Sequence, residues 1–219
     1  MPAFDPLHLT IALGPLAVYF LVLGLINLTR RPFLTTGARD FGALGIAISG
    51  LVIAGPMELF FPEGAAAAWG WLVWPLLLSL YYLGLVLVCL LIRPRLVIYN
   101  VSADELRDVL AKSLPAIDPQ AQLNVDALLL PNLGVQGHIE PFSSLRNVQI
   151  VASGPRQNHQ GWSHLAARLR PALREAHVPP NPYGVTLLMF AIFMLGSITF
   201  YVFRDQQAVA QAFQEMLRW

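Results

Sequence analysis

The chain of 219 residues is 56% hydrophobic and only 12% charged, whereas a soluble domain carries about 25% charged residues. The net charge is +1 and no dense basic cluster is present, which argues against a nucleic-acid partner. The single cysteine, Cys89, excludes an internal disulfide and a thiolate metal site. Most charges gather in residues 93–182, so the composition predicts an α-helical integral membrane protein with one extramembrane domain.

The first long apolar run covers residues 7–28. At 1.5 Å per residue it would be about 33 Å long, enough to cross a bilayer core of about 30 Å. A secretory signal carries its positive charge before the apolar core, whereas here Arg30 and Arg31 follow it. We therefore expect a retained transmembrane helix with its N-terminus outside and a kink at Gly14-Pro15.

The second apolar run, residues 41–61, begins with many small side chains. Gly45 and Ser49 form one pair of small residues four positions apart, and Ala43 and Ala47 form another. Such pairs let two helix backbones approach closely inside a membrane. Two interpretations remain open: the small residues pack against other spans of the same chain, which is common in bundles, or they mediate self-association.

The third run, residues 69–92, begins with three tryptophans, and the fourth, residues 183–203, has aromatic residues at both ends. Aromatic side chains gather at the headgroup level of membranes. These flanks complete a predicted set of four transmembrane helices, and an even number of spans places both chain ends on one side of the membrane.

The charges around these runs predict their direction. Arginines follow the first and third runs, at Arg30, Arg31, Arg39, Arg93 and Arg95. The loop between the second and third runs carries Glu58 and Glu63 and no cation. Because cytoplasmic loops are enriched in Lys and Arg, we expect residues 93–182 in the cytoplasm and both termini outside. Composition favours the bacterial cytoplasmic (inner) membrane.

Residues 93–182 are predicted to form a small cytoplasmic α+β domain inserted between the third and fourth spans. Residues 96–99 are β-branched and aromatic, which predicts a strand. Ser102 and Glu105 form a capping-box pattern that predicts the start of a helix. Pro115 is expected to lie beyond the end of that helix.

The remainder of the domain predicts an antiparallel meander and a second helix. Strands are expected at residues 128–130, 135–140 and 147–152, with a turn at 131–134 and a possible short strand at 122–124. An apolar stripe then predicts a helix that ends near His177, with a kink or break near Leu169 caused by Pro171. Two helices on one face of a small antiparallel sheet form an α+β sandwich.

Residues 204–219 are predicted to form an amphipathic helix at the outer membrane interface, in preference to a solvated tail. Its apolar residues recur at spacings of three and four, at Val209, Ala212, Phe213, Met216 and Leu217. Trp219 suits the depth of the lipid headgroups.

The sequence predicts no catalytic, cofactor-binding or metal-binding residue. His159 and His164 are five positions apart, whereas zinc ligands on a helix stand three or four apart. The glycosylation sequons at Asn27 and Asn100 are interpreted as chance matches. Glu58, at the outer end of the second run, is the best candidate for a functional ionisable group near a span, although a carboxylate that reaches water is the commoner role.

Two functions therefore compete. The favoured one is a non-enzymatic scaffold, accessory subunit or sensor in the lipid bilayer, whose cytoplasmic domain binds a protein partner. The alternative is a membrane enzyme or carrier that acts on a lipid or small molecule at the inner interface and uses Arg93, Arg95 and either His138 or His159.

Overall fold

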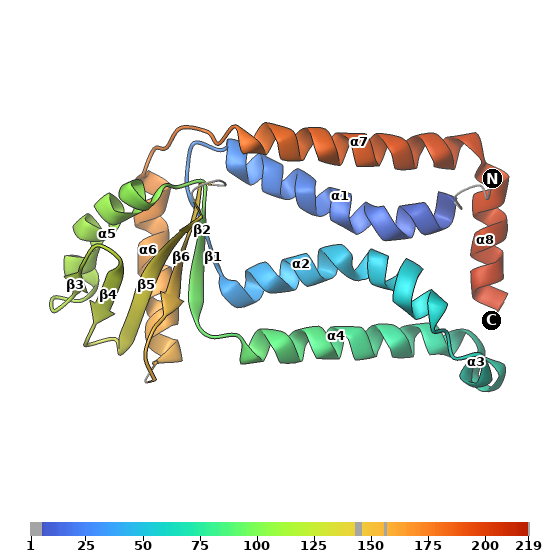
Figure 1. The fold of residues 1–219 in the computed structure, drawn as a ribbon, viewed down its shortest axis with the longest axis horizontal. Helices are drawn as coiled ribbons and strands as arrows, with labels where there is room; N and C mark the ends of the chain where they lie inside the picture. The colour runs from blue at the N-terminus through green and yellow to red at the C-terminus, as the bar shows by residue number, and fades with distance from the viewer. Residues whose placement is uncertain (1–5, 143–145, 156, 219) are drawn as a thin grey trace. The chain divides into compact units, whose positions relative to one another are not determined.

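A computed structural model describes residues 6–142, 146–155 and 157–218 (Figure 1). The chain divides into two compact units, which we call the helical unit and the sheet unit. The helical unit consists of Met1–Val22, Gly42–Leu90 and Leu187–Trp219, and the sheet unit consists of Leu23–Phe41 and Leu91–Thr186.

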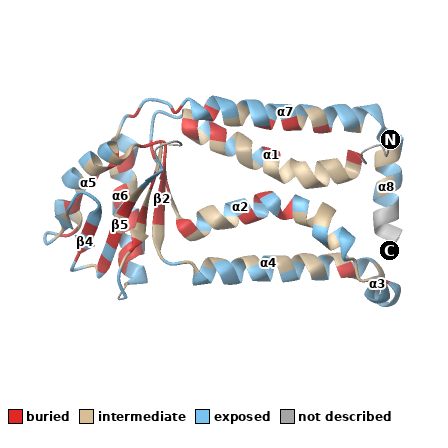
Figure 2. Ribbon diagram, in the orientation of Figure 1, coloured by how far each residue is buried: buried red, intermediate tan, exposed pale blue. Residues whose placement is uncertain are grey.

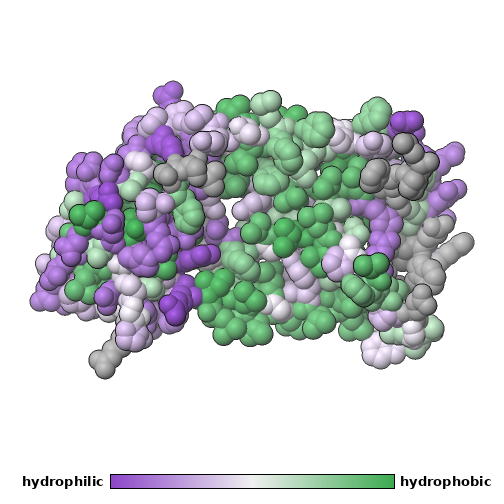
Figure 3. All heavy atoms as spheres, viewed as in Figure 1, coloured by the Kyte–Doolittle hydropathy of each residue, from purple (hydrophilic) through white to green (hydrophobic). Residues whose placement is uncertain are grey.

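Among the described residues, four segments are long and apolar enough to cross a membrane. They are Pro6–Leu28, which is α1; Gly37–Met57, which contains α2 (Gly37–Val52); Gly64–Leu91, which contains α4 (Val73–Leu91); and Tyr183–Arg204, which is α7. Large apolar side chains along them are exposed, for example Leu80, Leu83 and Leu90 on α4. Hydrophobic residues therefore dominate the visible surface of the helical unit (Figure 3), which is compatible with a membrane location.

Small residues on α2 allow close packing inside the helical unit. A Cβ atom at Gly50 would lie 1.9 Å from the carbonyl oxygen of Ile11, so α1 and α2 approach each other at backbone distance there. Gly45 accepts a hydrogen bond of 2.6 Å from the hydroxyl of Tyr81 on α4. Ala47 and Ser49 are buried. The small residues of α2 thus serve internal packing, the first of the two interpretations, while Ala43 is exposed.

The connection between α2 and α4 consists of short helical segments. After α2 the chain forms a π-helical turn, η1 (Ile53–Met57), which contains Pro56. Proline has no amide hydrogen, so the α-helical hydrogen-bond ladder is interrupted there. A short helix α3 (Glu63–Trp69) and a 3₁₀ turn η2 (Gly70–Leu72) lead into α4.

The C-terminal segment is helical, as α8 (Gln206–Arg218), and it contacts η2. Phe213 on α8 is exposed. The predicted anchor Trp219 lies outside the described residues, as do the side chains of Met216 and Leu217.

In the described part of the sheet unit, six antiparallel strands stand in the order β1-β2-β6-β5-β4-β3. Their bounds are Phe33–Thr36 for β1, Arg95–Tyr99 for β2, Gln122–Leu123 for β3, Ala127–Leu130 for β4, Val135–Phe142 for β5 and Asn147–Ala152 for β6. Helices α5 (Ala103–Ile117) and α6 (His159–Glu175) complete the unit. The short connection between β4 and β5 uses Gly134 with φ of +60°, a left-handed conformation that favours glycine.

The core of the sheet unit lies between the sheet and the two helices. Alternate strand residues face it, for example Leu96 and Ile98 on β2. Each helix contributes residues spaced three or four apart, including Leu106, Leu110 and Leu114 on α5 and Leu165, Leu169 and Leu173 on α6. Figure 2 shows buried stretches on the strands and on α6.

One strand of the sheet comes from outside residues 93–182. The connection after α1 was predicted as a loop, but residues Phe33–Thr36 form β1 and pair with β2, with Leu34 opposite Ile98. Leu34 is buried in the core. The prediction missed this strand because four residues carry little periodicity and the partner strand lies about sixty positions away.

The predicted position of Pro115 beyond the end of its helix is wrong, and so is the predicted break at Pro171. Pro115 lies inside α5, which continues to Ile117, and α6 is one continuous helix through Pro171. A proline withdraws the hydrogen bond to the carbonyl four positions earlier, which belongs to Ala111 in α5 and to Ala167 in α6. Both alanines are exposed, so water can satisfy these carbonyl groups and the helices need not end.

Candidate functional site

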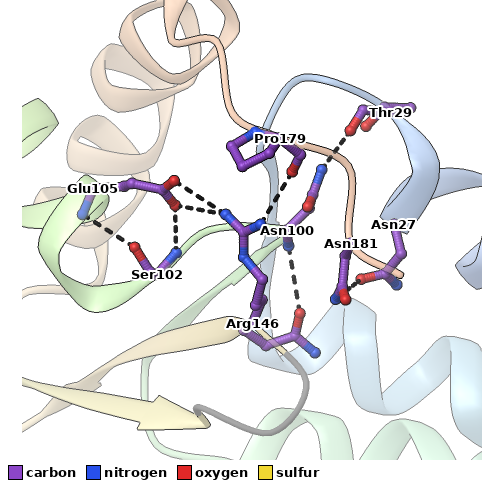
Figure 4. A network of polar contacts seen from close by, with 9 residues as sticks. Asn27, Thr29, Asn100, Ser102, Glu105, Arg146, Pro179 and Asn181 are labelled. Carbon is purple, nitrogen blue, oxygen red and sulfur yellow. Dashed lines mark hydrogen bonds and ion pairs between the residues drawn. The ribbon is translucent and has the colours of Figure 1, made fainter. Parts of the chain in front are cut away.

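The sheet unit includes the near ends of all four apolar helices, because residues 23–28 of α1, 37–41 of α2, Leu91 of α4 and 183–186 of α7 belong to it. Polar contacts, three of them from the buried side chains of Asn27, Asn100 and Asn181, link the ends of α1 and α7 to the rest of the sheet unit (Figure 4). We call this region the junction and define it by Asn27, Thr29, Asn100, Arg146 and Asn181.

A pair of asparagines joins α1 to α7. Asn27 and Asn181 are 3% and 0% exposed. The Asn181 amide nitrogen Nδ2 donates to Asn27 Oδ1 at 3.0 Å, and the Asn181 backbone N–H donates to the Asn27 carbonyl at 2.9 Å. Asn27 Nδ2 donates to the Leu23 carbonyl at 2.8 Å, and Asn181 Oδ1 accepts from the Tyr183 N–H at 3.1 Å. Each side chain uses both its donor and its acceptor, which offsets the cost of burying it.

The helices also approach closely beside this pair. A Cβ atom at Gly184 would lie 2.9 Å from the Gly24 carbonyl oxygen, so the first turn of α7 lies against the last turn of α1. The chain before α7 is bonded in the same way, since the Val178 N–H donates to the Arg30 carbonyl at 3.1 Å. The segment between α6 and α7 is therefore tied to the end of α1 by hydrogen bonds, in contrast to a flexible linker.

Asn100 fixes the turn between β2 and α5. Its φ of 57° is left-handed, a conformation that asparagine tolerates better than most residues. It is fully buried, and its Nδ2 donates to the Thr29 carbonyl just after α1. Asn100 Oδ1 is buried and has no hydrogen-bond partner among the described residues. With both sequon asparagines buried, neither has space for a glycan in this fold.

Arg146 also stabilises the turn between β2 and α5. Its Nη2 lies 3.0 Å from both carboxylate oxygens of Glu105, and its Nη1 donates to the Pro179 carbonyl at 3.2 Å. Ser102 and Glu105 form the predicted capping box at the start of α5. Burial by itself raises the pKa of the Glu105 carboxyl, but hydrogen bonds from Ser102 and Arg146 outweigh burial, so the pKa of Glu105 lies below its ordinary 4.5.

The sheet face opposite α5 and α6 carries a second polar cluster. The register places Gln149 opposite Glu140, and Val151 opposite both His138 and Arg95, with directly opposite side chains on the same face. His138 Nε2 lies 2.5 Å from Glu140 Oε1, and Arg95 Nη1 lies 3.5 Å from Gln149 Oε1. We call Arg95, His138, Glu140 and Gln149 the polar face.

The structure thus brings together two of the four residues named for the alternative function. Arg95 and His138 share the polar face, whereas His159 is the first residue of α6 on the opposite side of the sheet. Arg93 is exposed before β2. Sequence reasoning did not identify the junction, although asparagines at the ends of two apolar runs were a usable signal.

Glu58 belongs to the helical unit, whereas the junction and the polar face belong to the sheet unit. Its carboxylate forms an ion pair with His8 Nε2 at 2.9 Å, and the two side chains are 47% and 40% exposed. That degree of exposure fits a carboxylate near water, the commoner role expected from the sequence.

No group of three or more His, Cys, Asp or Glu side chains that could hold a metal ion occurs in the part of the chain that the structure describes. The junction and the polar face are clusters of hydrogen-bonded polar side chains. Comparisons of this chain with protein-family models, with curated proteins and with solved structures find no match, so the function is argued from these residues.

Proposed function

We propose that the chain spans the bacterial cytoplasmic membrane four times, with both termini outside and the sheet unit in the cytoplasm. The exposed apolar side chains of the four helices support insertion. Arg30, Arg31 and Arg39 after α1, together with Arg93 and Arg95 after α4, support the direction.

Cysteine labelling in a Cys89→Ala background tests this orientation. Gly64→Cys, at an exposed position of α3, should react with an impermeant thiol reagent in spheroplasts. Lys112→Cys, exposed on α5, should react only after the membrane is opened. The reverse labelling pattern would refute the proposed orientation.

We infer that the protein is a non-enzymatic scaffold, accessory subunit or sensor whose sheet unit binds a protein partner. The hydrogen-bonded connections of the junction support this inference. A domain that acts independently can be attached through flexible linkers, whereas here the connections after α1 and before α7 are bonded to the sheet unit or incorporated in it as β1. Such connections fix a binding surface relative to the helix ends, and they pass helix displacements to that surface.

Purification of the full chain from native membranes in mild detergent tests the inference. The wild-type chain should retain a stoichiometric protein partner. Asn181→Ala, which removes the bond to Asn27, should retain less of it, while Asn124→Ala, at an exposed asparagine, should behave as the wild type. A wild-type chain that carries a small molecule and no stoichiometric protein would contradict this function.

The alternative function, an enzyme or carrier for a lipid or small molecule, is supported by the polar face. Arg95 packs against α2, where a Cβ atom at Gly37 would lie 2.2 Å from Arg95 Cγ. Its Nε is buried without a hydrogen-bond partner among the described residues. An unsatisfied donor on the same sheet face as the His138–Glu140 pair is the kind of group that a ligand could satisfy. A ligand that co-purifies with the wild type and is lost in His138→Gln would support this alternative.

A further inference from the structure

A groove of about 560 Å³ lies between the C-terminal half of α6 and the segment that follows α1. Its polar lining consists of Arg31, Arg170, Arg174, Glu175 and His177. All five residues belong to the sheet unit, so the geometry of the groove is determined within one compact body. The groove is separate from the junction and from the polar face, and neither proposed function uses it.

The groove concentrates positive charge. Arg170 and Arg174 stand one helical turn apart on the same side of α6, and Arg31 comes from a distant part of the sequence. Three arginines and one glutamate give a formal charge of +3 − 1 = +2 with His177 neutral. The ion pairs of the sheet unit formed among the described residues involve Arg107, Arg146 and His138, and they leave the three groove arginines without a carboxylate partner.

The groove is also close in sequence to two apolar helices. Arg31 stands three positions after Leu28, the last residue of α1, and His177 stands six positions before Tyr183, the first residue of α7. The hydrogen bond from the Val178 N–H to the Arg30 carbonyl joins the two sides next to the groove. If these helices span a bilayer, their ends place the groove at headgroup level.

We propose that this groove binds a phosphate group, carried by the headgroup of an anionic phospholipid. Guanidinium groups bind phosphate oxygens in bidentate pairs, and arginines from two segments can contact one phosphate from two directions. Glu175 is the acceptor for a headgroup hydroxyl. Free phosphate shares this chemistry, so the experiment has one arm for lipid and one for inorganic phosphate. The groove then acts as a lipid sensor or anchor beside the junction.

A plain solvated arginine face is the competing explanation, and α6 provides the matched control. Arg168 is exposed on the same helix but does not line the groove. Non-specific attraction to anionic lipid would weaken by about the same amount when any one of these arginines is neutralised, whereas a site depends on the arginines that line it. The affected residues are partly or fully exposed, so their substitution should leave the core intact.

The test is a titration of the full-length protein with phosphatidylglycerol in neutral detergent micelles, with bound lipid counted by native mass spectrometry. The double variant Arg170→Gln/Arg174→Gln should bind about 30-fold more weakly, and Arg31→Gln about fivefold more weakly, because each arginine near anionic lipid contributes about fivefold. Arg168→Gln should stay within about twofold of the wild type. Phosphatidylcholine should not compete for the site.

A second arm measures inorganic phosphate by ³¹P NMR line broadening with the same variants. If inorganic phosphate binds and requires Arg170 and Arg174, but phosphatidylglycerol does not bind, the groove is a phosphate site. That result would overturn the proposal that the phosphate belongs to a lipid. Equal losses in Arg168→Gln and in Arg31→Gln would overturn the site, as would full affinity in the double variant. Arg31→Gln lies outside α6 and keeps the test valid if the double variant fails to fold.

Discussion

The asparagine pair at the junction should make a measurable contribution to local stability. Asn181→Ala removes the side-chain bond to Asn27 and the bond to the Tyr183 N–H. It leaves Asn27 Oδ1, on a side chain that is 3% exposed, without this donor. An unsatisfied buried group costs about 1–3 kcal/mol, and loss of a helix-terminal cap costs about 1 kcal/mol. We expect a loss of about 2–4 kcal/mol.

Hydrogen exchange is the suitable assay, because it reports local opening without requiring global two-state unfolding. Exchange of the Val178, Asn181 and Gly184 amides, which donate to Arg30, Asn27 and Asn181, should accelerate about 30-fold or more in Asn181→Ala, since 1.4 kcal/mol corresponds to about tenfold. Amides of β5 and β6 in the sheet should change much less.

A double-mutant cycle separates the pair from its surroundings. Asn27→Ala also loses the bond to Leu23, so each single variant should be clearly destabilised. The double variant should be less destabilised than the sum of the two by about 1 kcal/mol, because the shared bond is lost only once. Asn124→Ala serves as the exposed control. Additive effects, or exchange rates within about threefold of the wild type, would refute the role assigned to this pair.

Three further outcomes are expected. Gly50→Ala should lower the thermal midpoint in nanodiscs and cost about 1–3 kcal/mol, because its Cβ would meet the backbone of α1. Gly84→Ala, which has open space around it, should leave the midpoint unchanged. Equal midpoints for the two variants would show that α1 and α2 separate freely at Gly50. Because the pKa of Glu105 is lowered on folding, its contribution to stability is present above pH 4.5 and is lost as pH falls below that value. The midpoint difference between wild type and Glu105→Gln should therefore stay constant above pH 4.5 and shrink as the pH is lowered below it. A difference that does not shrink below pH 4.5 would contradict this. A soluble fragment of residues 93–180 lacks β1, which leaves β2 as an edge strand. Fusion of β1 to this fragment through a flexible linker should raise the cooperativity and the midpoint of thermal unfolding, measured by circular dichroism. No gain would mean that β2 is stable as an edge strand.

Several features follow from local sequence alone. Four apolar segments of sufficient length are visible because hydropathy is a sum over neighbouring residues, and no tertiary contact is needed to evaluate it. The capping box at Ser102 and Glu105 and the hairpin turn at Gly134 are equally local, because the residues that satisfy the backbone lie within a few positions. The antiparallel order of β4, β5 and β6 follows from short connections.

Other features depend on contacts between distant residues, and the tertiary structure alone decided them. Strand β1 is four residues long and exists because β2 provides its hydrogen bonds. Asn27 and Asn181 pair across more than 150 positions, and Arg31 meets Arg170 and Arg174 in one groove. Periodicity describes which face of an element is apolar, but it does not specify which distant polar groups meet, because that choice is made when the elements pack.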